Sequence, residues 1–472
     1  MDLRLQDLPD REFALLHESM LRLLSDYGVL FAHEEAQRLL GKAGNEVDTK
    51  GRVHLKPKFV ESMLAQSPKN GFVLSGRDEV KKVHAAPNQM SFRPSTGAPF
   101  ILDYAAGRPR EATMDDARIM ATLADALEGY GLVNSVVNPP GAPGGMGSVR
   151  LLVNAHRCSL KPSDVTVMTG EEVNLIGRIC AAIRGGEKES REKPLVAVDV
   201  AMITPLRCAR EQVKAFLECA KWGLPVEVLS SPTLGVSSPV TLAGGSLIAM
   251  AEMVAVLCLL YQIAPGLGII NAARVAPINM HTSEYNYGAP ELGMASVLLC
   301  AWSARYNIPC DMYGFGTYAK APGAQASMEK TFSGLLMALG HPYMITGGGI
   351  LDNALITSPE QLVIDNEAIK IIKRVRRPVT IDEDSLGIDV LLEAMKSDGV
   401  LLGEEHTARH VRAGEVVGCG LRQWFPAPAG EEVFPDLAAR AHKKKEEILA
   451  SHKVPPFDSI TEKQINRLLG DN

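Results

Sequence analysis

The segment "CAREQVKAFLECAKWGLPVEVLSSPTLG", residues 208–235, contains one complete unit of the fold. Its first half, up to Gly223, has the apolar spacing of a helix. Its second half begins with "LPVEVL", a β-branched run that is apolar except for Glu227, as expected of a strand buried on both faces. A polar loop, "SSPTLG", follows. A helix that leads directly into a buried strand indicates a parallel α/β fold.

The same alternation continues on both sides of this unit. Helical stretches occupy residues 114–130, 289–307 and 324–340, and short β-branched runs lie between most of them. The expected strands fall within residues 89–97, 131–138, 164–170, 194–202, 224–235, 266–277, 308–316 and 342–350. Eight such strands with intervening helices predict an α/β fold of the (β/α)8 TIM-barrel type. A doubly wound open sheet is the competitor, but no G-x-G-x-x-G motif follows the early strands.

Three parts are expected along the chain. Residues 1–85 form an N-terminal helical segment, residues 86–400 the β/α barrel, and residues 401–472 a C-terminal helical segment. The charged run "HKKKEE" at 442–447 is the solvated face of a helix in this interpretation.

Composition excludes several classes of protein. The 472 residues include 46% hydrophobic and 22% charged residues, and a formal charge of −6 leaves no basic surplus for nucleic acid or an anionic membrane. Acidic residues interrupt the first ten positions, so no secretion signal is expected. None of the eight cysteines forms a C-x-x-C pair, which indicates reduced thiols in a cytoplasmic protein.

The most apolar window, residues 244–273, requires a separate interpretation. It contains Glu252 and Gln262, and Pro265-Gly266 divides it into a helix of about twenty residues and a following strand. A helix buried against the sheet is expected here, not a membrane span.

In a barrel, functional residues follow the carboxyl ends of the strands. One such loop, "MHTSEYNYGAPE" (residues 280–291), combines a histidine, two tyrosines and two glutamates. The question it raises is which small molecule requires aromatic rings and negative charge together.

Several motifs, in order, resemble the trimethylamine methyltransferase (MttB-like) family. They are "PVTLAG" from Pro239, "AE" at 251–252, "YGAPELGM" at 287–294, "AKAPGAQASMEK" with Lys320, Gln325 and Glu329, and "SPEQLVIDNE" at 358–367. Upstream, "GAPFILDYAAGRPREATMDDARIMATLADAL" also resembles the family. The likeness covers about residues 90 to 410.

The resemblance implies a barrel enzyme that moves a methyl group from an amine to the cobalt of a separate, cognate corrinoid protein. The chain contains only standard residues, so it resembles the non-pyrrolysine branch, which acts on quaternary amines such as glycine betaine, proline betaine, carnitine or γ-butyrobetaine. The corrinoid (cobalamin) would belong to that partner, with no cofactor bound tightly to this chain. We also expect a homo-oligomer. Tyr318, Gly323 and Ile345-Thr346 depart from the family pattern, which indicates a differently shaped pocket.

A quaternary ammonium cannot donate strong hydrogen bonds, so aromatic faces and carboxylates are expected to hold it. The loops after the expected strands supply six aromatic candidates: Tyr285, Tyr287, Tyr313, Phe315, Tyr318 and Tyr343. The alternative is that these rings cap the barrel core.

Charged and polar candidates complete the expected site. Glu227 is a carboxylate inside a buried strand and requires a partner or a cation. Glu291 begins a helix, where it can also favour the helix dipole, and His281 is a candidate for polar contacts. Arg93, Arg274 or Lys320 can pair with a betaine carboxylate, and Gln325 belongs to a family motif.

Three alternatives remain open from the sequence. "TGGGILDN" (residues 346–353) suits an anion if its glycines open a helix, which would indicate a phosphate-substrate lyase or isomerase. A tight turn with positive φ explains the same glycines. A quaternary-amine binding protein without methyl transfer is the second alternative. A zinc enzyme is the third, although no paired Cys/His spacing supports it, and we expect no metal.

Overall fold

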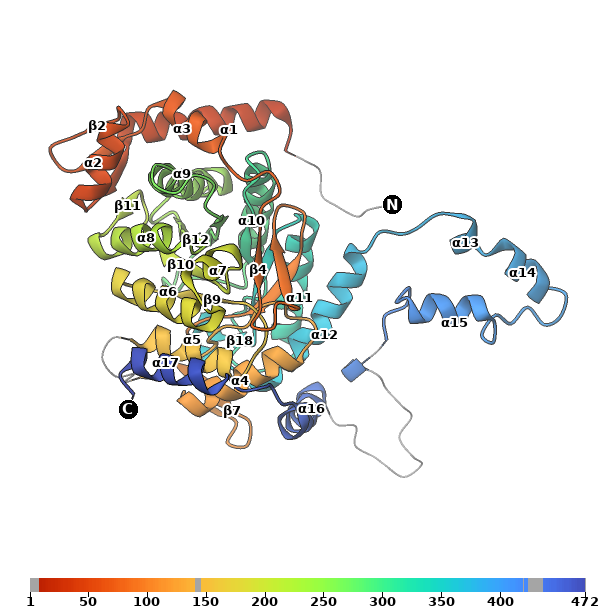
Figure 1. Ribbon diagram of the computed structural model, residues 1–472. Helices are drawn as coiled ribbons and strands as arrows, with labels where there is room; N and C mark the ends of the chain where they lie inside the picture. Colours follow the sequence, from red (N-terminus) through yellow and green to blue (C-terminus); the bar gives the residue numbers. More distant parts are fainter. Residues whose placement is uncertain (1–7, 141–145, 419, 423–435, 472) are drawn as a thin grey trace.

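The computed structural model describes residues 8–140, 146–418, 420–422 and 436–471 (Figure 1). Its central strands pair in parallel and in sequence order within two sheets, β9-β10-β12-β14 and β16-β17-β6. Their bounds are β6 Ser91–Pro94, β9 Ser163–Thr166, β10 Val196–Ala201, β12 Val226–Leu229, β14 Ile269–Asn271, β16 Asp311–Tyr313 and β17 Met344–Gly348.

The strand expected within residues 131–138 is present only as isolated contacts. Val133 bridges Ser163 of β9, and the Gly131 amide donates to the Phe92 carbonyl of β6 at 2.8 Å. The prediction of a regular strand here was wrong. Side chains explain the difference, because Asn134 Nδ2 donates to the Pro94 carbonyl at 3.0 Å and Ser135 Oγ to the Val137 carbonyl at 2.6 Å. These bonds take the place of regular ladder bonds.

Helices surround the parallel strands (Figure 1). Each packs on the next in chain order, and the last packs back on the first. They are α4 Met114–Ala126, α5 Gly147–Arg157, α6 Gly170–Arg184, α8 Arg210–Trp222, α9 Leu242–Tyr261, α10 Pro290–Ala304, α11 Ala324–Leu339 and α12 Pro359–Arg376, with the short α7 Glu187–Glu192 after α6. The predicted α/β class is confirmed by this arrangement.

Helix α9 is apolar on all sides because it is covered on all sides. The N-terminal helices α1 and α3 pack against it, as do α8 and α10. Among the described residues it is the one helix long and apolar enough to cross a membrane. However, 72% of its most apolar window is buried inside the protein. It is therefore a core helix here, as the charged Glu252 within it indicated.

The N-terminal part contains the expected helices and also short strands. The helices are α1 Asp10–Arg22, continued by the π-helix Leu23–Tyr27, α2 Glu34–Lys42 and α3 Pro57–Leu64. The strands β1 Val29–Phe31, β2 Glu46–Val47 and β3 Arg52–His54 form a small sheet with β11 Arg207–Cys208, and β4 Phe72–Ser75 pairs with β5 Lys82–Ala85. Strands of two to four residues are too short to show alternation in a sequence.

Small strand pairs extend the loops at the ends of the central strands. Strands β13 Thr233–Leu234 and β15 Ala276–Pro277 pair with each other. Strands β18 Ile350–Leu351, β19 Ile356–Thr357, β7 Phe100–Asp103 and β8 Arg108–Glu111 form a further sheet.

The described residues of the C-terminal part form two contrasting groups of helices. Helices α16 Leu437–Ser451 and α17 Ser459–Leu469 return to the body, where α16 packs on α12 and α4 and α17 packs on α6. Helices α13 Glu383–Leu386, α14 Ile388–Ala394 and α15 Glu405–Arg412 extend away from it (Figure 1). We call residues 379–416 the arm.

Seven of the cysteines are free, and six of these are buried. Cys419 lies outside the described residues.

Candidate functional site

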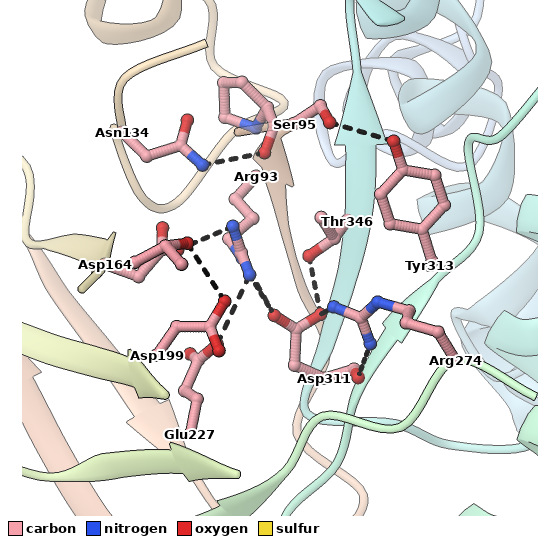
Figure 2. Close-up of polar contacts among 12 residues, drawn as sticks. Arg93, Ser95, Asn134, Asp164, Asp199, Glu227, Arg274, Asp311, Tyr313 and Thr346 are labelled. Atoms are coloured by element: carbon pink, nitrogen blue, oxygen red, sulfur yellow. Dashed lines mark hydrogen bonds and ion pairs between the residues drawn. The ribbon is translucent and has the colours of Figure 1, made fainter. Parts of the chain in front are cut away.

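Arg93, on β6, is the centre of a buried ion network among the parallel strands (Figure 2). Its Nη1 lies 2.6 Å from Asp164 Oδ2, an ion pair without hydrogen-bond geometry. Its Nε and Nη2 donate to Asp311 Oδ2 at 2.9 and 2.6 Å, and Nη2 also contacts Glu227 Oε2 at 3.3 Å. Only 1% of its surface is exposed. A guanidinium in this position is held by carboxylates and is not available to a betaine carboxylate, which corrects the expectation for Arg93.

The carboxylates come from four strands, Asp164 from β9, Asp199 from β10, Glu227 from β12 and Asp311 from β16. All four are buried. With Arg274, the network contains two guanidinium groups and four carboxylates, so it has an acidic surplus. An excess of buried carboxylates requires protons or a bound cation.

The carboxylates differ in how well they are compensated. Burial raises the pKa of Asp164 to about 7 and that of Asp199 to about 6, and it raises the pKa of Glu227 well above its usual range. Asp311 differs, because both arginines lie beside it and hold its pKa below the usual value despite burial. Asp311 is therefore the best-compensated counter-ion of Arg93, and the other three carboxylates take up protons more readily.

Arg274 follows β14 and continues the network toward the aromatic loops. Its Nη1 donates to the Asp311 carbonyl at 2.6 Å, and its Nη2 lies 3.6 Å from Asp311 Oδ1. Thr346 Oγ1 donates to the same Asp311 oxygen at 2.5 Å.

Three of the predicted tyrosines form a stack beside Arg274. The ring centroids of Tyr285 and Tyr287 are 4.7 Å apart, and those of Tyr287 and Tyr313 are 4.5 Å apart. The Tyr285 hydroxyl donates to the Arg274 carbonyl, and the Arg274 guanidinium lies 5.5 Å from the centroid of Tyr313. We call this group the tyrosine stack. The structure thus brings Tyr285, Tyr287, Tyr313 and Arg274 together, with a cation of the protein itself against the rings.

Across Arg93 from the tyrosine stack lies a cavity of about 430 Å³, which we call the carboxylate cavity. Its polar lining includes Asn134, Asp164, Thr166 and Asp199, and its apolar lining includes Val137, Leu151, Leu152, Ala155, Val165 and Leu229. Met168, which is largely exposed, also contributes. Figure 2 shows Asn134, Asp164 and Asp199 on one side of Arg93 and Arg274 and Tyr313 on the other.

The other predicted aromatic residues are placed differently. Phe315 and Tyr343 are buried in the core, where Phe315 packs edge-on against Phe92 at 6.0 Å between centroids. For these two residues the alternative expectation, that the rings belong to the core, describes the structure. Tyr318 is partly buried, and its hydroxyl donates to Glu284.

The remaining candidates lie apart from the ion network. His281 is exposed, Lys320 is exposed and lies 3.9 Å from Asp352, and Gln325 donates to Glu329 at 2.9 Å. Glu291 stands in the first turn of α10, where a carboxylate favours the helix dipole. Glu227 is the one predicted catalytic residue that belongs to the network.

The three glycines of "TGGG" do not open an α-helix. Gly347 and Gly348 are part of β17, and Gly347 and Gly349 have φ of +117° and +80°. A Cβ on Gly348 would lie 2.6 Å from the Tyr130 ring. The glycines therefore serve backbone conformation and close packing, and the expected helix N-terminus for a phosphate is not formed by them.

One group of potential metal ligands occurs in the described residues, Asp384, His406 and His410 in the arm. Arg409 donates to both oxygens of Asp384 at 2.7 and 2.5 Å. The carboxylate is thus already neutralised by a guanidinium, and the group is remote from the ion network.

Sequence reasoning missed Asp164, Asp199 and Asp311. The signal that identified Glu227 applies equally to them, because each is a lone acidic residue within an apolar strand, in "SDVTV", "VAVDVA" and "PCDMY". Four such residues on parallel strands predict a shared interior site.

Known methyltransferases are similar to this chain over nearly its whole length. A family model described as "Trimethylamine methyltransferase (MTTB)" matches residues 3–469. Trimethylamine methyltransferase MttB of Desulfitobacterium hafniense is 26% identical over 95% of this chain and 90% of its own length. Glycine betaine methyltransferase of the same species is 27% identical over 96% and 94%.

A trimethylamine methyltransferase MttB of Methanosarcina barkeri is 28% identical over 95% of this chain and 91% of its own length. Among solved structures, the monomethylamine methyltransferase MtmB of Methanosarcina barkeri matches with a TM-score of 0.54 and 11% identity. That match covers 99% of this chain and 88% of that chain. At this identity the likeness shows a shared fold only.

Proposed function

Since this chain belongs to the trimethylamine methyltransferase family, we propose that it transfers a methyl group from a methylated amine to the cobalt of a separate corrinoid protein. The predictions of the family and of a methyltransferase are confirmed by the comparisons. The observation that carries the proposal is the acidic surplus around Arg93, among the parallel strands, because an amine substrate is a cation.

The chemistry requires little of the protein beyond positioning. A nucleophilic cobalt(I) forms a bond to the methyl carbon, the carbon–nitrogen bond breaks, and its electron pair stays on nitrogen. A quaternary ammonium leaves as a neutral tertiary amine, so no proton has to be supplied. Residues of this chain would bind and orient the ammonium and exclude water. The corrinoid would arrive with the partner, and no cofactor tightly bound to this chain is part of the proposal.

We further propose that the parallel strands close into an eight-stranded barrel. Three contacts support closure: the bridge between Asn271 and Cys310, the bridge between Val133 and Ser163, and the bond from the Gly131 amide to Phe92. They join the two sheets and residues 131–137 in the order expected of a barrel. Residues 86–400 would then be the barrel segment, with helical segments at 1–85 and 401–472.

A quaternary amine is the proposed methyl donor, with glycine betaine, proline betaine, carnitine and γ-butyrobetaine as the first compounds to test. The relative named glycine betaine methyltransferase supports this choice, as does a chain of standard residues only. The test mixes the purified protein with cob(I)alamin and each amine and follows the loss of the cob(I)alamin absorbance. Loss with one amine supports the proposal. A folded protein that binds an amine but never consumes cob(I)alamin, with or without its corrinoid protein, would be a binding protein instead.

We propose that the chain works as a homo-oligomer in the cytoplasm and that the arm contacts a second copy. The arm exposes large apolar side chains, among them Ile381, Leu386, Ile388, Leu392, Met395 and Leu402. Several of its charges are paired within it, as in Asp384–Arg409 and Glu393–Lys396. An apolar surface with internally paired charges suits a permanent interface between identical subunits.

Three substitutions test the arm. Changing Leu386, Leu392 and Leu402 together to Ser should convert the oligomer to a monomer in sedimentation analysis. Changing three exposed residues of the body, Leu15, Val236 and Val240, to Ser is the matched control. An oligomer that survives the arm substitutions, or a native protein that is monomeric, would contradict the proposal.

A further inference from the structure

The carboxylate cavity has acceptor atoms that nothing in the described part of the chain satisfies. Asp199 accepts one bond, from Thr166 Oγ1 to Oδ2 at 3.1 Å, and its Oδ1 has no donor. Asn134 Oδ1 has none either, although its Nδ2 is bonded to Pro94. Asp199 is 4% exposed and Asn134 is 1% exposed. Buried polar atoms are almost always partnered, so these atoms indicate a ligand.

The unsatisfied atoms have a common character. Asp199, Asp164 and Asn134 line the cavity, and their unsatisfied atoms are carboxylate oxygens and an amide oxygen. A third carboxylate in the lining, that of Glu172, is already satisfied, because it caps α6 and accepts from the backbone amides of Met168 and Thr169 at 2.8 and 3.0 Å. Asp199 Oδ1 and Asn134 Oδ1, which have no donor, are both acceptors, and the one ion pair of Asp164 is with Arg93. The ligand that complements two acceptors beside a carboxylate surplus is a cation.

The rest of the lining sets the shape of that cation. Leu151, Leu152, Val137 and Leu229 give an apolar wall opposite the carboxylates. Apolar walls with few convergent polar groups are typical of sites for small molecules, and a volume of about 430 Å³ is in their usual range. A compact ammonium ion with alkyl substituents meets both demands, charge against Asp199 and methyl groups against leucine.

Positive charge is missing from the lining. No lysine, arginine or histidine is among the described residues that line the cavity. The nearest guanidinium, that of Arg93, is already paired with three carboxylates. A ligand with its own carboxylate would thus place that group beside Asp164 and Asp199 with no counter-ion, and like charges in a buried site repel strongly.

The tyrosine stack, by contrast, does not require a bound cation. Its cation is Arg274, and its Tyr285 and Tyr313 hydroxyls bond to the Arg274 carbonyl and to Ser95 Oγ, the latter at 2.9 Å.

We propose that the carboxylate cavity is the amine site, that Asp199 with Asp164 and Asn134 holds the ammonium group, and that the site takes methylated ammonium ions without a carboxylate and excludes betaines. This narrows the proposed function, on which it rests for the identity of the ligand as a methylated amine: glycine betaine, proline betaine, carnitine and γ-butyrobetaine all carry a carboxylate, so none of the four should be the donor. Tetramethylammonium-like ions and alkylammonium ions with an N–H bond share this chemistry, and the binding panel distinguishes them.

Choline and glycine betaine form the decisive pair, because they share the trimethylammonium group and differ in a hydroxymethyl against a carboxylate. Calorimetry at pH 8 on the full chain, without cobalamin or partner, should show choline binding at least tenfold tighter than glycine betaine. Tetramethylammonium should bind as choline does. If trimethylammonium binds tighter than tetramethylammonium, its N–H is the preferred donor to Asp199.

Asp199→Asn should weaken choline binding at least tenfold. Glu252→Gln is the matched control, since Glu252 is a buried carboxylate outside the cavity whose bonds come from Thr204, Ser230 and the Leu206 amide. It should change choline affinity less than threefold. The melting temperature of each variant reports folding.

Equal affinity for choline and betaine, unchanged choline binding in Asp199→Asn, or no binding of any cation to the folded protein would overturn the inference. The methyl-transfer assay fails independently. Choline binding without methyl transfer would support the cavity as the amine site and contradict the proposed reaction. Methyl transfer from betaine in an Asp199→Asn variant would support the reaction and contradict the cavity as the amine site.

Discussion

The tyrosine stack and the carboxylate cavity lie on opposite sides of Arg93. The polar groups of the stack have partners within the protein, whereas the cavity has polar atoms without them. In the stack, Arg274 lies 5.5 Å from the Tyr313 centroid, and the hydroxyls of Tyr285 and Tyr313 are bonded. In the cavity, Asp199 and Asn134 have buried oxygens without donors among the described residues. The difference shows that residue types alone do not identify a binding site, because a suitable group can already be satisfied within the protein.

Arg93 joins the two sides, so its removal should have the largest effect. Arg93→Met leaves Asp164, Glu227 and Asp311 without their shared cation, and breaking a buried ion pair costs about 3–5 kcal/mol. Urea unfolding should show a loss of this size. Arg118→Met, at an exposed pair with Asp115, should cost less than about 1 kcal/mol. A loss for Arg93→Met as small as that of the control would show that the network is not a structural unit.

The stability of the Asp199→Asn variant should move in the opposite direction. Burial raises the pKa of Asp199 to about 6, so the folded protein binds more protons than the unfolded chain between about pH 4 and 6. Stability therefore falls as pH rises through this window, and the ionised carboxylate is a cost at pH 8. Removing it should stabilise the protein by about 3 kcal/mol at pH 8 and much less at pH 4.

Thermal unfolding at the two pH values measures this difference. A loss of stability at pH 8 would mean that Asp199 has a structural partner, and the cavity would lose its main indication of a ligand.

The affinity for a cation should depend on pH if the cation lies in the carboxylate cavity. Choline requires ionised Asp199, and the groups that face it are Thr166 and the charges of Arg93, Arg274, Asp164 and Asp311. A pKa of about 6 leaves about a tenth of the Asp199 carboxylate ionised at pH 5, so affinity should fall about tenfold from pH 8 to pH 5. Calorimetry at both pH values measures it. A flat profile would place the cation against the tyrosines, whose charge does not change in this range.

Changes in the tyrosine stack should have the smallest effect on the cation. Replacing Tyr285 and Tyr287 by Leu removes two rings and the bond to the Arg274 carbonyl. Choline affinity should change less than threefold, although the loop should become less stable. A loss of tenfold or more would show that these tyrosines hold the cation, as the sequence of the loop predicted.

The fold was largely predictable from the sequence because buried parallel strands have a strong apolar signature. Seven of the eight expected strands are regular, and the exception at residues 131–138 follows from Asn134 and Ser135, whose side chains replace ladder bonds. The short strands of the N-terminal part left no periodic signal.

The site was predictable in part. Glu227 was identified because a charge inside a buried strand is rare, and the same argument identifies Asp164, Asp199 and Asp311 once it is applied to every strand. The role of Arg93 could not be derived, since its position against three carboxylates depends on how strands more than a hundred residues apart meet. Phe315 and Tyr343 were expected in the loops after the strands, yet they are core residues, because their neighbours in space are apolar.

The most direct test of the account is a crystal structure of the protein with tetramethylarsonium, a cation shaped like tetramethylammonium whose arsenic gives an anomalous signal. We predict an arsenic peak in the carboxylate cavity, between Asp199, Asp164 and Asn134. A peak over Tyr285, Tyr287 and Tyr313, or no peak at a concentration that saturates binding in solution, would contradict it.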